Sequence, residues 1–70
     1  MEATLWLIIS LYTYNAAGET LTHRELVKPL PASQCPRELS KMWKEWDEAY
    51  GGDVGRGFIG KCSGSRPVEI

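Results

Sequence analysis

The stretch Leu5–Tyr14, LWLIISLYTY, is the most apolar segment of the chain, and it determines which fold the other residues can form. In a β-strand, successive side chains point to opposite faces of the sheet. One face of this stretch is then aliphatic, whereas the other is aromatic and only partly polar. Two apolar faces are typical of a central strand that is covered on both sides. We therefore predict a central strand, with Leu5, Leu7, Ile9, Leu11 and Thr13 on one face and Trp6, Ile8, Ser10, Tyr12 and Tyr14 on the other.

A secretory signal or a membrane anchor would also account for so apolar a stretch. Signal peptides begin with basic residues, but Met1–Thr4 contains an acid and no base, although Asn15–Ala17 loosely fits a cleavage site. A transmembrane helix needs about 20 apolar residues, and this run is too short. The abundance of Leu, Ile, Trp, Tyr and Thr favours a strand, and we expect no membrane span.

A second, outer strand is expected after a turn. Asn15–Gly18 is typical of a hairpin turn in which Asn and Gly supply the positive-φ positions. Residues 19–30, ETLTHRELVKPL, then alternate between two sets of side chains. Their charges suit an edge strand that must avoid further pairing. Pro29 and Pro31 should end this strand, because proline cannot donate to a hydrogen-bonded ladder.

A helix is expected next. Ser33 is placed to act as its N-cap, and Pro36 falls in the first turn, where its missing N–H does no harm. Gly51-Gly52 should end the helix. From Cys35 onward the apolar side chains occupy one arc of a helical wheel. They are Leu39, Met42, Trp43, Trp46, Ala49 and Tyr50.

Residues 55–62, GRGFIGKC, indicate a short third strand, and residues 63–70, SGSRPVEI, indicate a loose tail. A right-handed crossover would lay the third strand parallel to the second. If the third strand crosses the first strand and pairs with its other edge, the sheet order becomes 2-1-3 and every neighbouring pair is antiparallel. The sequence therefore predicts one small α+β domain over residues 1–70, with element order β-β-α-β, a three-stranded antiparallel sheet and one helix packed on one face.

Cys35 and Cys62 are the two cysteines of the chain, and His23 is its one histidine. They are too few for the usual cysteine and histidine zinc sites, so we expect no metal and no cofactor. A disulfide between the two cysteines would stabilise so small a domain by roughly 3–4 kcal/mol, which is a large share of its total stability. The alternative is a pair of reduced, buried thiols in a cytosolic protein.

Cys35 also opens the expected helix, and a helix N-terminus favours the reactive thiolate form of a cysteine. Redox enzymes pair such a cysteine with a second one three residues later, where this chain has Glu38. We therefore predict that the protein is not an enzyme, and a thiol-dependent redox protein using Cys35 is the alternative. His23 stands alone in the second strand and is interpreted as a surface or hydrogen-bonded residue.

The charge of the chain argues against nucleic-acid binding. Eight Lys and Arg residues and nine Asp and Glu residues give a formal net charge of −1, without long runs of either sign. Phosphate backbones attract clusters of Lys and Arg, and these are missing here. We therefore expect a protein partner and no nucleic acid.

A single helix can cover only one face of a three-stranded sheet, and we expect it on the aliphatic face of the first strand. The aromatic face would then be uncovered. Exposed apolar patches commonly mark protein interfaces, in which Trp and Tyr are the usual anchors. The alternatives are that residues 65–70 fold back over this face or that the two faces are exchanged. We predict an interface, with a foreign protein or with a second copy, formed by Trp6, Ile8, Tyr12 and Tyr14 and oriented by the charges of Arg24 and Lys28.

The whole chain combines an apolar opening strand, a second strand containing Thr and His, a proline-rich link into a helix that opens with Cys35, and a last strand ending in Cys62. This pattern resembles that of small β-β-α-β accessory proteins encoded by phages and prophages. The resemblance implies a protein that inhibits a host protein by stoichiometric binding, and hence a place in the host cytoplasm. A disulfide would instead favour an extracytoplasmic, oxidising setting.

Overall fold

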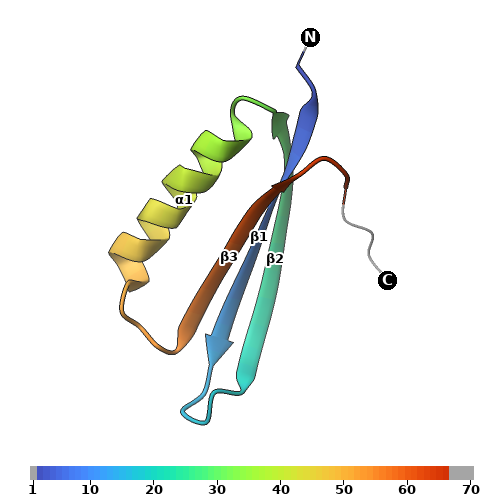
Figure 1. Cartoon of the computed structure of the whole chain (residues 1–70). Coiled ribbons are helices and arrows are strands. Elements are labelled where there is room, and N and C mark those ends of the chain that lie inside the picture. The colour runs from blue at the N-terminus through green and yellow to red at the C-terminus, as the bar shows by residue number, and fades with distance from the viewer. Residues whose placement is uncertain (1, 67–70) are drawn as a thin grey trace.

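The computed structural model describes residues 2–66, which form three strands and one helix. In chain order these are β1 (Thr4–Tyr14), β2 (Thr20–Pro31), α1 (Cys35–Tyr50) and β3 (Arg56–Ser63). Both neighbouring pairs of strands are antiparallel, and the sheet order is β2-β1-β3, so β1 lies in the centre (Figure 1). The predicted fold class, element order and sheet order are confirmed. Of the tail predicted over residues 63–70, Ser63 belongs to β3, and residues 67–70 lie outside the described part of the chain.

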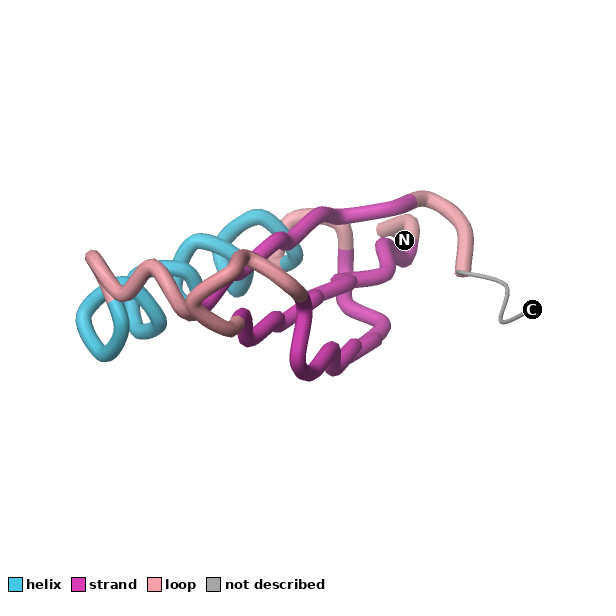
Figure 2. The backbone as a smooth tube through the Cα atoms, turned by 90° about the horizontal axis from the view of Figure 1, so that it is seen from below, coloured by secondary structure: helices cyan, strands magenta, loops and turns pink. Residues whose placement is uncertain are grey.

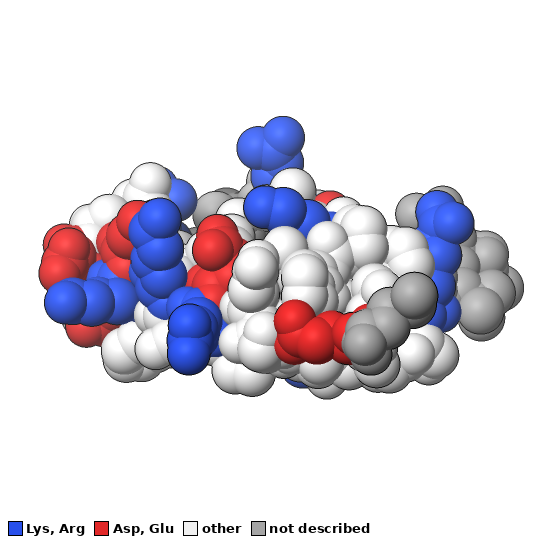
Figure 3. Space-filling model, turned by 90° about the horizontal axis from the view of Figure 1, so that it is seen from above, with Lys and Arg blue, Asp and Glu red and all other residues white. Residues whose placement is uncertain are grey.

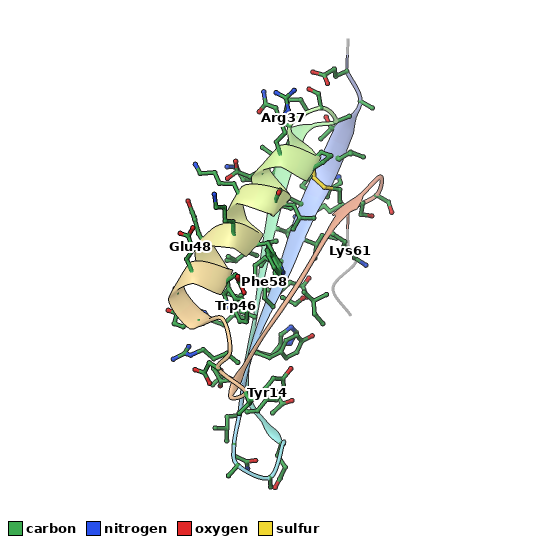
Figure 4. The ribbon with its side chains drawn as sticks, turned by 60° about the vertical axis from the view of Figure 1, so that its left-hand side comes forward. Tyr14, Arg37, Trp46, Glu48, Phe58 and Lys61 are labelled. Carbon is green, nitrogen blue, oxygen red and sulfur yellow. A yellow bond between two sulfur atoms is a disulfide. The ribbon has the colours of Figure 1, made fainter. Side chains whose placement is uncertain are left out.

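The helix α1 covers one side of the sheet, and no described helix covers the other side (Figure 2). It packs against β3 and β1, over the aliphatic face of β1, as predicted. The side chains of Leu7, Ile9 and Cys35 are at most 2% exposed and form the centre of the core. Further along the helix, the rings of Trp46 and Phe58 meet with their centroids 5.7 Å apart (Figure 4). The apolar side chains packed around the centre are Leu5, Leu11, Leu30, Leu39, Met42, Phe58 and Cys62.

The hydrogen bonds of the sheet alternate between the two neighbours of β1. The Ala32 N–H donates to the carbonyl of Ala3 at 2.9 Å, and the Tyr14 N–H donates to the carbonyl of Gly55 at 2.8 Å. Hydrogen-bonded pairs alternate with non-bonded pairs along an antiparallel ladder. Therefore odd-numbered residues of β1 bond to β2, and even-numbered residues bond to β3.

The strand β2 ends at Pro31, as predicted, but it continues through Pro29, which was also expected to end it. Pro29 pairs with Trp6 and Pro31 pairs with Thr4, which are even-numbered residues of β1. The nitrogens of both prolines therefore face the outer edge of the sheet, where no ladder bond is lost. Proline interrupts a ladder only where its nitrogen faces a partner strand.

The hairpin turn between β1 and β2 is held by the side chain of Asn15. Its Oδ1 accepts the backbone N–H groups of Ala17 and Glu19, each at 2.9 Å. Gly18 adopts a φ of +81°, whereas no described residue other than glycine has a positive φ. The predicted turn is present, but Asn15 contributes as a hydrogen-bond acceptor and not, as predicted, through a positive φ.

The helix α1 begins without the predicted serine cap. Gln34 occupies the N-cap position and makes no side-chain capping bond. The Ser33 N–H instead donates to Oε1 of Glu2 at 2.9 Å. Hydrogen bonds from the side chain and the backbone N–H of Ser33 hold the pKa of the Glu2 carboxyl below its usual range. As predicted, Pro36 lies in the first turn and the helix ends directly before Gly51.

A disulfide joins Cys35, at the start of α1, to Cys62 in β3 (Figure 4), as one of the two predicted alternatives requires. The Cα atoms of the two residues lie 6.2 Å apart. Two residues earlier on β3, a Cβ atom at Gly60 would collide with the side chain of Leu39. The missing side chain of Gly60 therefore lets the helix approach the strand closely.

Candidate functional site

The side of the sheet opposite α1 is called the open face here. Residues that lie opposite each other across an antiparallel ladder share a face, so the register identifies its members. β1 contributes Trp6, Ile8, Ser10, Tyr12 and Tyr14; β2 contributes His23, Glu25, Val27 and Pro29; and β3 contributes Gly57, Ile59, Lys61 and Ser63. Lys61 points away from the helix side of the sheet (Figure 4). The four interface residues predicted on β1 therefore lie on one surface.

Three rings stack in a row at the hairpin end of the open face. The rings of Tyr12 and His23 lie with centroids 4.5 Å apart and planes 1° apart. The centroids of Tyr12 and Tyr14 lie 6.1 Å apart, with planes 8° apart. Gly57 makes room for this row, because a Cβ atom there would lie 2.8 Å from the Tyr14 hydroxyl. Stacked rings contribute about 0.5–1.5 kcal/mol per pair beyond their buried area, so the row is held in place before any partner arrives.

Trp6 occupies the opposite end of the open face. The guanidinium carbon of Arg66 lies over its ring, 5.6 Å from the centroid, which is within cation–π distance. Arg66 belongs to the segment predicted to fold back over this face in one of the alternatives. It reaches Trp6, whereas residues 67–70 lie outside the described part of the chain.

The centre of the open face is apolar and partly self-covered. Ile8 is only 7% exposed, and Trp6 and Tyr12 are half-buried. Val27 and Ile59, on the strands to either side, are 40% and 60% exposed. The apolar area that a partner would meet thus comes from the outer strands as well as from the predicted anchors. Val27 and Ile59 were not among the predicted site residues, because their side of the sheet follows only from the pairing register.

Arg24 and Lys28 do not belong to the open face. Both pair with aliphatic residues of β1 whose side chains lie under the helix. Lys28 lines a groove of about 520 Å³ between β2 and α1, together with the carboxylates of Glu38 and Glu45. The prediction that these two cations orient a partner at the aromatic face is therefore corrected: even-numbered residues of β2 face the helix side.

Cys35, the residue of the alternative redox function, offers no free thiol. Its side chain is 0% exposed and is bonded to Cys62. A nucleophilic thiolate needs both a free sulfur and access for its target, and this position provides neither. Residues 2–66 also contain no cluster of three or more His, Cys, Asp or Glu side chains that could hold a metal ion.

No protein-family model, no curated protein and no solved structure matches this chain. Within residues 2–66, no helix is long and apolar enough to cross a membrane. A function for this chain must therefore be inferred from the surfaces described above.

Proposed function

We propose that this chain is a non-enzymatic protein-binding module whose open face contacts the partner. The observation that carries the proposal is that Trp6, Tyr12 and Tyr14 lie together on the side of the sheet that no described helix covers. Trp and Tyr often dominate the binding free energy of protein interfaces, because they bury a large and rigid area. A sheet face that only meets water usually carries polar side chains.

Charges near the open face favour one kind of partner surface. Lys61 lies beside Ile8, and Arg66 lies over Trp6, so the Trp6 end of the face is basic. Glu25, the one acid among the open-face residues, lies opposite Ser10 near the middle. A partner with an apolar centre and carboxylates facing the Trp6 end would complement this pattern.

The helix side of the molecule has a different character. Lys, Arg, Asp and Glu side chains intermingle there (left in Figure 3). Mixed charges of this kind are typical of a solvated surface. The contrast between the two sides supports the open face, rather than the exposed side of α1, as the contact surface.

The size of the open face limits the affinity that we expect. Strands lie roughly 4.8 Å apart and rise about 3.3 Å per residue, so three strands that pair over eight residues present roughly 400 Å² of flat surface. A standard interface uses about 800 Å² from each partner. A face of this size is typical of weak or transient contacts.

The first measurement is the solution mass by light scattering across a dilution series, which shows whether the partner is a second copy. If the protein is a monomer, it serves as immobilised bait, and the captured proteins are identified by mass spectrometry. Trp6→Ala and Tyr12→Ala should each weaken the resulting complex by about 2 kcal/mol, which is roughly 30-fold in Kd. The matched control is Leu26→Ala, because Leu26 is 49% exposed but pairs with Ile9 on the helix side.

Circular dichroism of each variant separates lost binding from lost folding. If folded Trp6→Ala and Tyr12→Ala proteins bind as tightly as the parent protein, the open face is not the contact surface and the proposal fails. A viral origin and the inhibition of a host protein stay predictions, since none of the contacts described above bears on them.

A further inference from the structure

The outer edge of β3 carries backbone groups that are free to pair with another strand. The hydrogen bond from Tyr14 to Gly55 sets the phase of the β1–β3 ladder, so odd-numbered residues of β3 bond to β1. The N–H and C=O groups of the even-numbered residues Phe58, Gly60 and Cys62 then point outward. No described strand pairs with this edge, and no proline interrupts it within β3.

A groove of about 710 Å³ runs along the same edge, between β3 and α1. Its lining is mostly apolar and consists of Pro36, Leu39, Ser40 and Trp43 from the helix and Phe58, Ile59, Gly60 and Cys62 from the strand. Trp43 and Ile59 are 52% and 60% exposed, although both are large apolar residues. The volume lies in the range of about 300–1,000 Å³ that is typical of ligand pockets. Exposed apolar side chains that meet at such a groove indicate a missing partner.

The free edge and the groove together fit an extended peptide. A strand added to β3 would form hydrogen bonds with the outward backbone groups. The side chain opposite Gly60 would lie on the helix side of the sheet, because paired residues share a face, and it would enter the groove beside Trp43. In strand addition, main-chain hydrogen bonds supply affinity and pockets for alternate side chains supply specificity. Both parts are present at this edge.

Cations close to this edge limit the peptide further. On α1, Arg37 and Lys44 lie three residues before and four residues after Ser40, so all three share one side of the helix. On β3, Lys61 directly follows Gly60 but points to the open face. Each of these three cations is exposed. In an added strand, the residues on either side of the apolar one would point to the open face, so acidic residues there would lie beside Lys61 and complement its charge.

We propose that the edge of β3 and the adjoining groove bind an extended peptide segment of another protein, with an apolar side chain in the groove and acidic residues flanking it. This site is distinct from the open face and would add a second contact to the function proposed above. Ile59 borders both surfaces, so it is not a residue that can separate them.

The test uses a capped hexapeptide of alternating Glu and Leu, titrated into the full, oxidised chain labelled with ¹⁵N. The amide signals of Phe58, Gly60 and Cys62 should move most. Their hydrogen exchange should slow about tenfold when the free peptide is at ten times its Kd. The Lys and Leu version of the peptide should bind at least tenfold more weakly, because its cations would face Lys61.

Alternate N-methylation of the peptide distinguishes strand addition from simple apolar adsorption. Only one of the two alternating sets of peptide N–H groups can face β3, so methylation of one set should abolish binding and methylation of the other should preserve it. Trp43→Ala should weaken binding at least tenfold, whereas the control Leu26→Ala should not. The proposal is overturned if both methylated peptides bind equally, or if the moved signals lie on β2 or β1 instead of β3.

One further variant separates this site from the open face. Tyr12→Ala should bind the hexapeptide as the parent protein does, because Tyr12 lies on the open face and does not line the groove. If Tyr12→Ala loses the peptide while Trp43→Ala keeps it, the peptide occupies the open face. The edge site is then refuted, whereas the function proposed for the open face stands.

Discussion

Replacing both Cys35 and Cys62 by alanine should lower the free energy of unfolding by about 3.5 kcal/mol. The disulfide links positions separated by 27 residues, and loop-closure entropy for a link of that length is worth about 3.5 kcal/mol in the unfolded chain. A chain of 70 residues has a total stability of about 4–10 kcal/mol. The link therefore supplies a third or more of the stability, and its loss should lower Tm by about 14–28 °C.

The assay is thermal unfolding followed by far-ultraviolet circular dichroism, at several scan rates to establish reversibility. Three samples are compared: the oxidised parent protein, the parent protein with excess reductant, and the double alanine variant. The reduced parent keeps both sulfur atoms in the core, so it isolates the effect of the link from that of side-chain packing. A Tm within about 5 °C of the oxidised parent for both of the other samples would refute the reasoning, since the link would then contribute almost nothing.

Three further substitutions probe local features of the fold. Gly60→Ala should destabilise the protein by about 1–3 kcal/mol in urea unfolding, because the added methyl group collides with Leu39 between helix and strand. An unchanged urea midpoint would contradict the close approach of α1 to β3. Gly18→Ala should cost about 1 kcal/mol in the same assay through its φ of +81° alone, since nothing lies within 4 Å of the added carbon. Glu2→Gln should reduce the loss of stability at acid pH. Because the pKa of Glu2 is lowered, its hydrogen bonds with Ser33 stabilise the fold above the usual glutamate pKa, and this stabilisation is lost as pH falls through the lowered value. If the free energy of unfolding falls equally with acid pH in the parent protein and the variant, the contact is unimportant.

The position of β1 and the side on which the helix packs were predictable because they follow from composition. A strand with one aliphatic and one aromatic face belongs in the centre of the sheet, and the aliphatic face is the one that α1 covers. The disulfide was one of two alternatives, and the predicted topology is compatible with it. With sheet order 2-1-3, the start of the helix and the end of the third strand lie near each other, and Cys35 and Cys62 stand at those two places.

The orientation of the charges on β2 was not predictable, because it depends on the pairing register. A shift of one residue moves every side chain of a strand to the other face, and composition alone does not determine the shift. The prediction that Arg24 and Lys28 orient a partner at the aromatic face is therefore wrong, because they lie on the helix side. The exposure of Val27 and Ile59 and the groove beside β3 depend on the same register and on the tilt of the helix.

The start of the helix illustrates a second limit. Ser33 is a favourable N-cap by local rules, but its N–H donates to Glu2, a residue 31 positions away in the sequence. The residues next to Ser33 in the sequence give no sign of a hydrogen-bond partner so far away along the chain. Likewise, Pro29 and Pro31 interrupt a strand by local rules, and only the phase of the ladder shows that their nitrogens face outward.

The disulfide also closes a covalent ring that contains α1, the loop after it and β3 up to Cys62. Val54, in that loop, is 96% exposed and is an accessible place for a protease to cut. A single cut there would leave one molecule, whose two pieces separate on a gel only after reduction. A cut in the hairpin turn around Ala16 lies outside the ring and would divide the chain at once, with only non-covalent contacts left to hold β1. These two exposed loops therefore differ in what a protease can do to them.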